Sequence, residues 1–165
     1  MILTGKEIQR AVADETISIS PFSEKQLNPN SYNYRLSEHI AIPEYDSKLE
    51  TLAYKTIRIP EQGILLEPGQ TYLSHTFEKL GSSKYAMSLI GRSSIGRLGL
   101  FVQVSANLGH TKSCHHWTLE IVACKKIILY PRMIIGQISF WANHGDYFYS
   151  DIRYNKFDVL MPSLD

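Results

Sequence analysis

Short strand-like segments recur along most of this chain, and no other feature of the sequence constrains its fold as strongly. The segments are apolar, or they alternate between apolar and polar residues, and turn-forming runs such as EPGQ at 67–70 and YPRM at 130–133 separate them. The predicted strands are residues 17–20, 32–36, 56–59, 63–66, 71–76, 85–90, 100–105, 117–123, 126–129 and 134–141. Many short strands with turns between them are typical of a barrel or sandwich, so the predicted fold class is mainly β.

One helix is predicted near the amino-terminal end, over residues 4–12. Thr4 can serve as its N-cap, and Glu7 stands three residues later, where a capping box needs an acidic partner. Ile8 and Ala11 then fall on one face of the helix, which predicts that this face packs against the strands.

The carboxyl-terminal segment, about residues 143–165, is aromatic and polar without clear periodicity. Two interpretations stay open: an arm or lid, and a tail packed on a neighbouring surface. A chain of 165 residues with no internal repeat and no long linker suits one core, so we expect a single domain over residues 1–165.

Composition argues against several classes of partner. The formal net charge is +1, so no field of the whole protein attracts nucleic acid or an anionic membrane, and neither is expected as a partner. No apolar stretch reaches the roughly 18–20 residues that span a bilayer, and the first residues do not resemble a signal peptide. The two cysteines, Cys114 and Cys124, make no disulfide framework. We therefore expect a cytoplasmic protein with reduced thiols.

The stretch GRSSIGRLGL at 91–100 combines cations, hydroxyls and bare backbone. A loop of Gly and Ser lets backbone N–H groups approach an anion, and the arginines offer forked donors that suit phosphate oxygens. Two interpretations remain at this point: a phosphate-binding loop, or a turn between strands with solvated arginines.

Glu120 stands inside the otherwise apolar strand predicted at 117–123. Alternation puts Thr118 and Glu120 on one face of this strand and Leu119 and Ile121 on the other. A carboxylate among apolar neighbours costs free energy to bury, which makes it a candidate proton shuttle. The alternative is a glutamate on an edge strand that faces water.

The run HTKSCHH at 110–116 gathers histidines and a cysteine, and Cys124 adds a second thiol. A zinc site is one interpretation, and a polar loop rich in histidine is the other. The spacing fits no zinc pattern, and the His-x-Glu and Pro-Cys-x-x-Cys motifs of zinc nucleobase deaminases are absent from the sequence. We therefore expect no zinc.

Taken together, several segments resemble the dCTP deaminase family of the dUTPase-like superfamily. The resemblance covers roughly residues 1–141 and is carried by the stretch at 91–100, the Thr-Leu-Glu at 118–120, and the segments 1–8, 27–36 and 130–140.

This resemblance implies a distorted β-barrel of the dUTPase-like type, assembled as a homotrimer with active sites between subunits. It implies that Glu120 is the general base and acid, and that the backbone carbonyl of Ala106 helps order the catalytic water. Mg²⁺ would enter with the triphosphate. The residues implied to hold the phosphates are Arg92, Ser93 and Ser94, and those implied to order the water with Ala106 are Ser93 and Arg97.

The sequence also departs from the family pattern. Residues 110–115 replace an Asp-Pro-Gly-x-x-Gly loop, and without glycine this loop loses easy access to positive φ. Asn33 replaces an Asp, Gln103 replaces the His of some members, and Arg153-Tyr154 keeps only part of the lid motif. The residues expected at the substrate loop and lid are His110, Gln103, Thr118, Gln137, Arg153 and Tyr154.

The resemblance implies deamination of dCTP to dUTP and ammonia. One alternative is a bifunctional enzyme that continues to dUMP and pyrophosphate. A dUTPase is another, although His110 stands where that enzyme needs an acidic residue. A deaminase or hydrolase of a modified cytosine nucleotide and a non-catalytic, nucleotide-binding regulator complete the alternatives.

Overall fold

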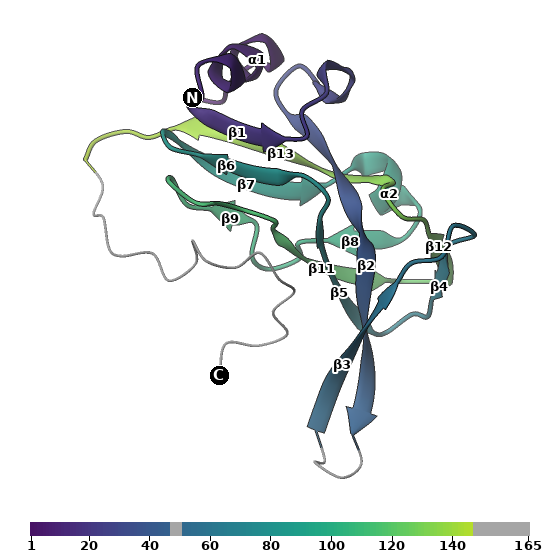
Figure 1. The fold of residues 1–165 in the computed structure, drawn as a ribbon. Helices are drawn as coiled ribbons and strands as arrows, with labels where there is room; N and C mark the ends of the chain where they lie inside the picture. The colour runs from purple at the N-terminus through teal and green to yellow at the C-terminus, as the bar shows by residue number, and fades with distance from the viewer. Residues whose placement is uncertain (47–50, 147–165) are drawn as a thin grey trace.

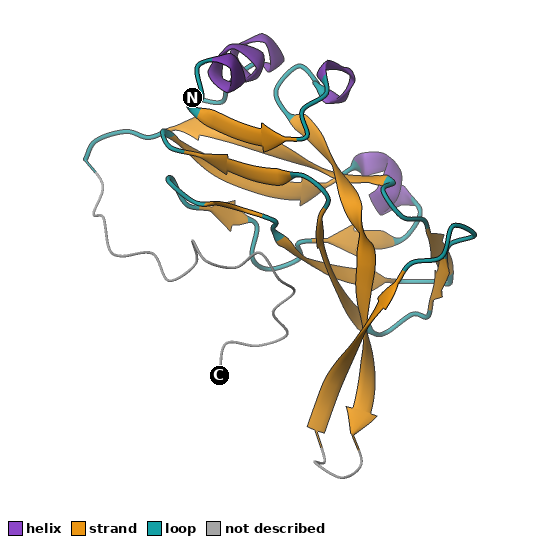
Figure 2. Cartoon of the chain, in the orientation of Figure 1, coloured by secondary structure: helices purple, strands orange, loops and turns teal. Residues whose placement is uncertain are grey.

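Strands make up most of the chain, and short helices lie at its periphery (Figure 2). The computed structural model describes residues 1–46 and 51–146. The helices are α1 (Gly5–Ala13), the 3-10 turn η1 (Glu24–Gln26) and α2 (Ser93–Arg97). The strands are β1 (Ile17–Ser20), β2 (Tyr32–Asp46), β3 (Thr51–Arg58), β4 (Ile64–Leu66), β5 (Thr71–Thr76), β6 (Lys79–Ser82), β7 (Tyr85–Gly91), β8 (Leu100–Val102), β9 (Leu108–Gly109), β10 (Cys114–His115), β11 (Thr118–Ala123), β12 (Ile127–Leu129) and β13 (Ile134–Ala142).

The largest sheet has eight strands and curls into an incomplete barrel (Figure 1). Its order is β8-β11-β5-β2-β13-β7-β9, and β3 pairs with β2 beside this path. Within the described residues, a three-stranded sheet β1-β6-β10 and the pair β12-β4 complete the β structure. The mainly-β prediction is confirmed.

Helix α1 forms as the sequence predicts, one residue later at each end. The Thr4 side chain accepts a hydrogen bond from the Glu7 N–H at 3.4 Å, so the predicted N-cap is present. Ile8 and Ala11 are buried against the strands. Within the part of the chain that the structure describes, no helix is long and apolar enough to cross a membrane.

Strand β2 is much longer than the predicted 32–36. Beyond Ala41 it no longer pairs with β5 and forms a two-stranded arm with β3 that extends from the body (Figure 1). An arm of this kind has no core to cover on one face, so it leaves no alternating pattern in the sequence. Pro43 lies in this part of β2, where the strand pairs with β3 but no longer with β5. Proline has no N–H to donate, so it is tolerated where one edge of a strand is unpaired.

Strand β6, which the sequence analysis missed, depends on close backbone packing. Gly81 lies opposite Cys114 of β10, and a Cβ at position 81 would overlap the Cys114 side chain and the Ser113 carbonyl. Such a strand carries little apolar side chain, and hydrophobic periodicity therefore does not detect it.

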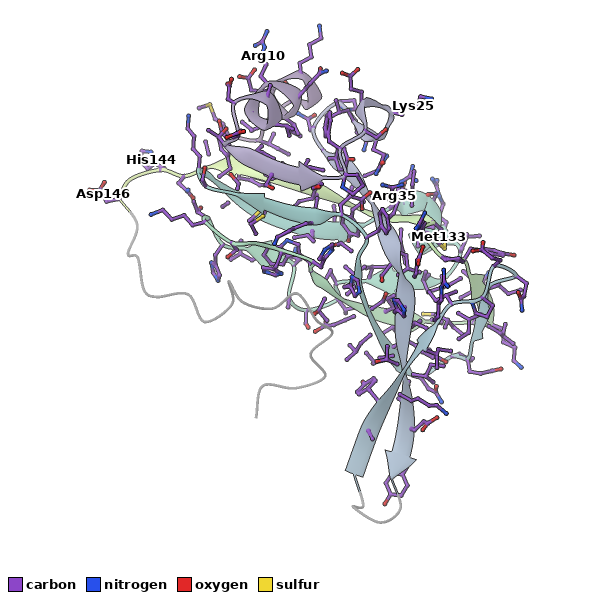
Figure 3. All side chains as sticks on the ribbon, in the orientation of Figure 1. Arg10, Lys25, Arg35, Met133, His144 and Asp146 are labelled. Carbon is purple, nitrogen blue, oxygen red and sulfur yellow. The ribbon has the colours of Figure 1, made fainter. Side chains whose placement is uncertain are left out.

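A buried ion pair connects β2 to the turn before β6. Glu78 has no exposed surface, and its carboxylate accepts hydrogen bonds from Arg35 Nε at 2.6 Å and from the Arg35 backbone N–H at 2.8 Å. Gln26 of η1 adds a third donor at 3.1 Å. Arg35 lies early in β2 (Figure 3). Its guanidinium carbon lies over the Phe77 ring, 4.6 Å from the ring centroid. Several donors thus compensate the cost of burying this carboxylate.

The core is a single cluster of apolar side chains from α1 and the strands, with Tyr32, Tyr34 and Phe140 among its largest members. Tyr34 is fully buried and donates to the Ile90 carbonyl at 3.2 Å. Gly136 of β13 lies directly beneath the Tyr34 ring, where a Cβ would overlap it.

Gly136→Ala is therefore expected to destabilise the fold. The added methyl overlaps a ring that has no room to move, so the free energy of unfolding should fall by about 3 kcal/mol, a cost of overpacking. Urea unfolding measures this change. Gly96→Ala is the matched control because a Cβ there meets no atom within 4 Å. An unchanged midpoint for Gly136→Ala would contradict the packing account.

Candidate active site

Within the stretch at 91–100, residues Ser93–Arg97 form the short helix α2, where the sequence analysis predicted a loop or turn. The Arg92 carbonyl accepts hydrogen bonds from the N–H groups of Ile95 at 3.0 Å and Gly96 at 2.8 Å, which closes the first turn of α2. Ile95 is buried and attaches the helix to the body. Gly99, at φ +83°, then redirects the chain into β8. The glycines and serines predicted a loop, but a single helical turn tolerates both residue types when a buried side chain holds the turn in place.

The start of α2 lines a cleft of about 570 Å³. The opposite wall is the segment before β2, and Gln137 of β13 joins the two walls. The lining residues are Asn28, Pro29, Asn30, Ser31, Arg92, Ser93, Ser94, Arg97 and Gln137. Two of these are arginines and none is acidic, so the cleft is positively charged and rich in hydrogen-bond donors. Such a lining suits an anion with several oxygens.

A chain of hydrogen bonds holds the wall of this cleft. Asn33 and Asn28 form a reciprocal amide pair, with N···O distances of 2.9 and 3.4 Å. Asn28 also donates to the Ser31 hydroxyl at 3.2 Å, and Ser31 donates to Gln137 Oε1 at 2.8 Å. Gln137 Nε2 reaches the Gly91 carbonyl at 3.5 Å. Asn33, where the family pattern has Asp, therefore organises the cleft through neutral amides.

Glu120 lies in β11, between β5 and β8. Leu119 and Ile121 are fully buried, whereas Glu120 is half-buried on the opposite face, which confirms the predicted alternation. Its carboxylate Oε2 accepts a hydrogen bond from the Ser105 hydroxyl at 2.9 Å. Glu120 does not line the cleft at α2, so within one chain the two parts of the predicted site lie apart.

Gln103 connects Glu120 to the segment after β8. The strand predicted at 100–105 ends at Val102 because Gln103 adopts a left-handed conformation, with φ +56°. Its N–H donates to the Glu120 carbonyl, and its side-chain Oε1 accepts from the Glu120 N–H, both at 3.1 Å. Gln103 Nε2 donates to the Ala106 carbonyl at 3.2 Å. The side-chain amide thus takes the place of the backbone carbonyl that a regular strand would offer.

Comparison with known proteins identifies the family to which this arrangement belongs. A family model described as dCTP deaminase-like matches residues 2–143, which is most of the chain. The chain belongs to the dCTP deaminase-like family. This result confirms the resemblance predicted from the sequence, and it places the chain among enzymes.

Relatives over the full length agree with this assignment. The chain is 44% identical over 167 residues to a Clostridium beijerinckii protein named dCTP deaminase, dUMP-forming, covering 99% of this chain and 96% of the relative. Proteins of the same name from Hathewaya histolytica and Cytophaga hutchinsonii are 44% and 42% identical over 168 residues, with the same coverage of both chains.

A solved structure supports the fold. The crystal structure of the 2'-deoxycytidine 5'-triphosphate deaminase from Agrobacterium tumefaciens matches 87% of this chain with a TM-score of 0.69 at 22% sequence identity. The present chain spans about half of that longer protein, 48% of its length.

The loop at 110–116, which departs from the family pattern, forms ordered structure. Lys112 reaches φ +72° although it is not glycine, so the loss of the glycines does not exclude positive φ here. His115 lies in β10 and packs on Trp117 with ring centroids 4.1 Å apart, whereas His116 Nδ1 reaches the Thr76 carbonyl at 3.0 Å. Over residues 1–46 and 51–146, no three His, Cys, Asp or Glu side chains converge as a metal site.

The remaining predicted residues lie in different places. Thr118 is on the same face of β11 as Glu120 and pairs across the sheet with His75. Burial lowers the pKa of His75, which favours its neutral ring. His110 is exposed at the start of its turn. Arg153 and Tyr154 lie outside the described residues, as does most of the proposed arm.

The sequence analysis did not identify two polar residues that line the cleft or the serine that contacts Glu120. Asn28 and Ser31 belong to the segment 27–36, which carried part of the family resemblance, so that motif pointed to the cleft without assigning the side chains. Ser105 had no motif of its own, and its role depends on a contact with Glu120 that strand periodicity does not predict.

Arg92→Ala should weaken the affinity of the cleft for inorganic triphosphate by about tenfold, because a charge-assisted hydrogen bond is lost. Isothermal calorimetry measures the change. Arg10→Ala, which removes an exposed arginine of α1, is the matched control and should bind as the unmodified protein does. Equal affinity of the Arg92 variant and the control would remove Arg92 from the anion site.

Proposed function

We propose that this chain deaminates dCTP and converts the product to dUMP, releasing ammonia and pyrophosphate. The relatives that match the whole chain are named dUMP-forming, which favours the bifunctional alternative over release of dUTP. The observation that carries the proposal is the cationic cleft at α2, because its two arginines and its serines match a polyphosphate.

In this proposal Arg92, Ser93 and Ser94 bind the triphosphate. The arginine supplies charge and paired donors, and the serines at the start of α2 add hydroxyl and backbone donors. Mg²⁺ enters with the nucleotide, because the described residues that line the cleft offer no carboxylate to hold the ion and Mg²⁺ readily keeps phosphate and water ligands.

The complete site is proposed to form between chains of a homotrimer. Glu120, Gln103 and Ala106 form one group of linked residues, while Ser93 and Arg97 line the separate cleft. A site that needs both groups is therefore completed when the cleft of one chain meets the outer face of β11 in the next. Exposed apolar side chains near both groups, Leu98, Phe101, Val104 and Leu108, support such a contact.

The proposed chemistry uses Glu120 to move protons in place of a zinc-activated water. Water adds to C4 of cytosine while Glu120 takes one of its protons and delivers it to N3. The second proton of the same water then passes through Glu120 to the amino group, and ammonia leaves as the C4 carbonyl forms. Ser93, Arg97 and the Ala106 carbonyl orient the water, and such preorganised groups lower the barrier.

The second proposed step is hydrolysis of the resulting dUTP. Water attacks the α-phosphorus, its oxygen remains on dUMP, and pyrophosphate leaves with the Mg²⁺ that it binds. The arginines of the cleft compensate the negative charge that develops on the phosphate oxygens during this displacement.

The product ratio tests the proposed function directly. With dCTP and Mg²⁺, we expect one pyrophosphate for each ammonia and dUMP as the nucleotide product, measured by coupled assays and chromatography. Accumulation of dUTP without pyrophosphate would reduce the function to deamination alone. Binding of dCTP without either product would favour the non-catalytic regulator, and turnover only of modified cytosine nucleotides would favour that alternative.

Glu120→Gln should lower the rate of ammonia release by about a thousandfold, within the range of general acid–base catalysis. The amide keeps the shape of the side chain but cannot take a proton, so dCTP binding should persist. Steady-state kinetics and calorimetry measure the two effects. Glu61→Gln, at an exposed turn, is the matched control. Normal turnover by the Glu120 variant would contradict the mechanism.

A further inference from the structure

Ser105 makes the side-chain contact with the Glu120 carboxylate. It lies between β8 and β9, in the segment that turns after Gln103, and its hydroxyl donates to Glu120 Oε2 at 2.9 Å. A hydrogen bond from a hydroxyl to a carboxylate is charge-assisted, so it is stronger than one between neutral groups.

The backbone around Ser105 is fixed relative to Glu120. Gln103 binds both main-chain groups of Glu120, and its Nε2 holds the Ala106 carbonyl at 3.2 Å. Ser105 lies between these two attachment points, so the position of its hydroxyl is set by contacts to the same residue that it binds. Preorganisation of this kind reduces the entropy cost of orienting a side chain.

The two oxygens of the Glu120 carboxylate are consequently not equivalent. Oε2 accepts the Ser105 proton, whereas Oε1 has no hydrogen-bond partner among residues 1–46 and 51–146. A general base needs an oxygen that can approach the attacking water, and Oε1 meets that requirement.

The side chains that lie opposite Glu120 on the neighbouring strands carry no charge that could orient its carboxylate. At the positions opposite Glu120 stand Leu73 of β5 and Gln103 after β8, neither of which ionises. Farther along β5, His75 lies opposite Thr118, and its Nε2 is bonded to the Ser37 hydroxyl at 2.9 Å. The hydroxyl of Ser105 is therefore the polar side-chain group that fixes the carboxylate.

We propose that Ser105 is a positioning residue for the deamination: it holds Oε2 of Glu120, so that Oε1 takes the proton from water and delivers it to N3. This inference rests on the proposed function and adds to it the orientation of the general base. Ser105 itself exchanges no proton with the substrate, and the proton balance of the reaction is unchanged.

Ser105→Ala and Ser105→Thr, assayed with dCTP in the full-length protein, test the proposal. Loss of the hydroxyl should lower kcat for ammonia release about tenfold, the effect of one hydrogen bond to a charged group. KM should stay within about twofold because ground-state binding is not affected.

Threonine keeps a hydroxyl on the same carbon, so Ser105→Thr should recover most of the rate. Ser18→Ala, at an exposed serine of β1, should leave kcat and KM unchanged. An unaltered kcat in Ser105→Ala would overturn the proposal, as would a change in KM in place of kcat or equal damage in the Thr variant. A wild-type protein without deaminase activity would instead refute the proposed function, whereas an active wild type with an inactive Glu120→Gln isolates the failure to Ser105.

Discussion

The alternation of side chains in β11 is the constraint on which the rest of the site depends. Leu119 and Ile121 have no exposed surface and Ala123 almost none, so a shift of one residue in register would bury Glu120 in the core. Strand β11 pairs with β5 on one side and with β8 on the other, so two strands fix its register. Burial of the apolar face of β11 thus directs the Glu120 carboxylate away from the core.

A second constraint separates the charges of the site. The arginines of the cleft lie at α2, where amide and hydroxyl groups around Gln137 hold the opposite wall, and Glu120 lies in β11, outside the cleft lining. Under the proposed function, assembly of chains brings the two together, so that oligomerisation is a requirement of catalysis.

Periodicity correctly predicted the features that local patterns determine: the mainly-β class, helix α1 with its Thr4 cap, strands such as Thr71–Thr76, and the placement of Glu120 on the face of its strand opposite Leu119. Periodicity failed where contacts between distant segments decide the local conformation of the chain. Buried Ile95 makes a helix of a stretch that reads as a loop, and the left-handed Gln103 ends β8 early. The cleft and the Ser105 contact join residues far apart in sequence, so they required the folded chain, although the family motif had already marked Arg92 and its neighbours.

The account depends most on the division of one active site between two chains. At dCTP concentrations well below KM, Arg92→Ala should keep about a tenth of the wild-type rate and Glu120→Gln about a thousandth. Trimers refolded from an equal mixture should recover full activity in about one quarter of their sites, since those interfaces combine an intact cleft with an intact carboxylate. Ammonia release from the mixture, with exchange of differently tagged chains verified, is the measurement. Recovery near that level is the predicted result, and activity no greater than that of the two separate variants would contradict the account.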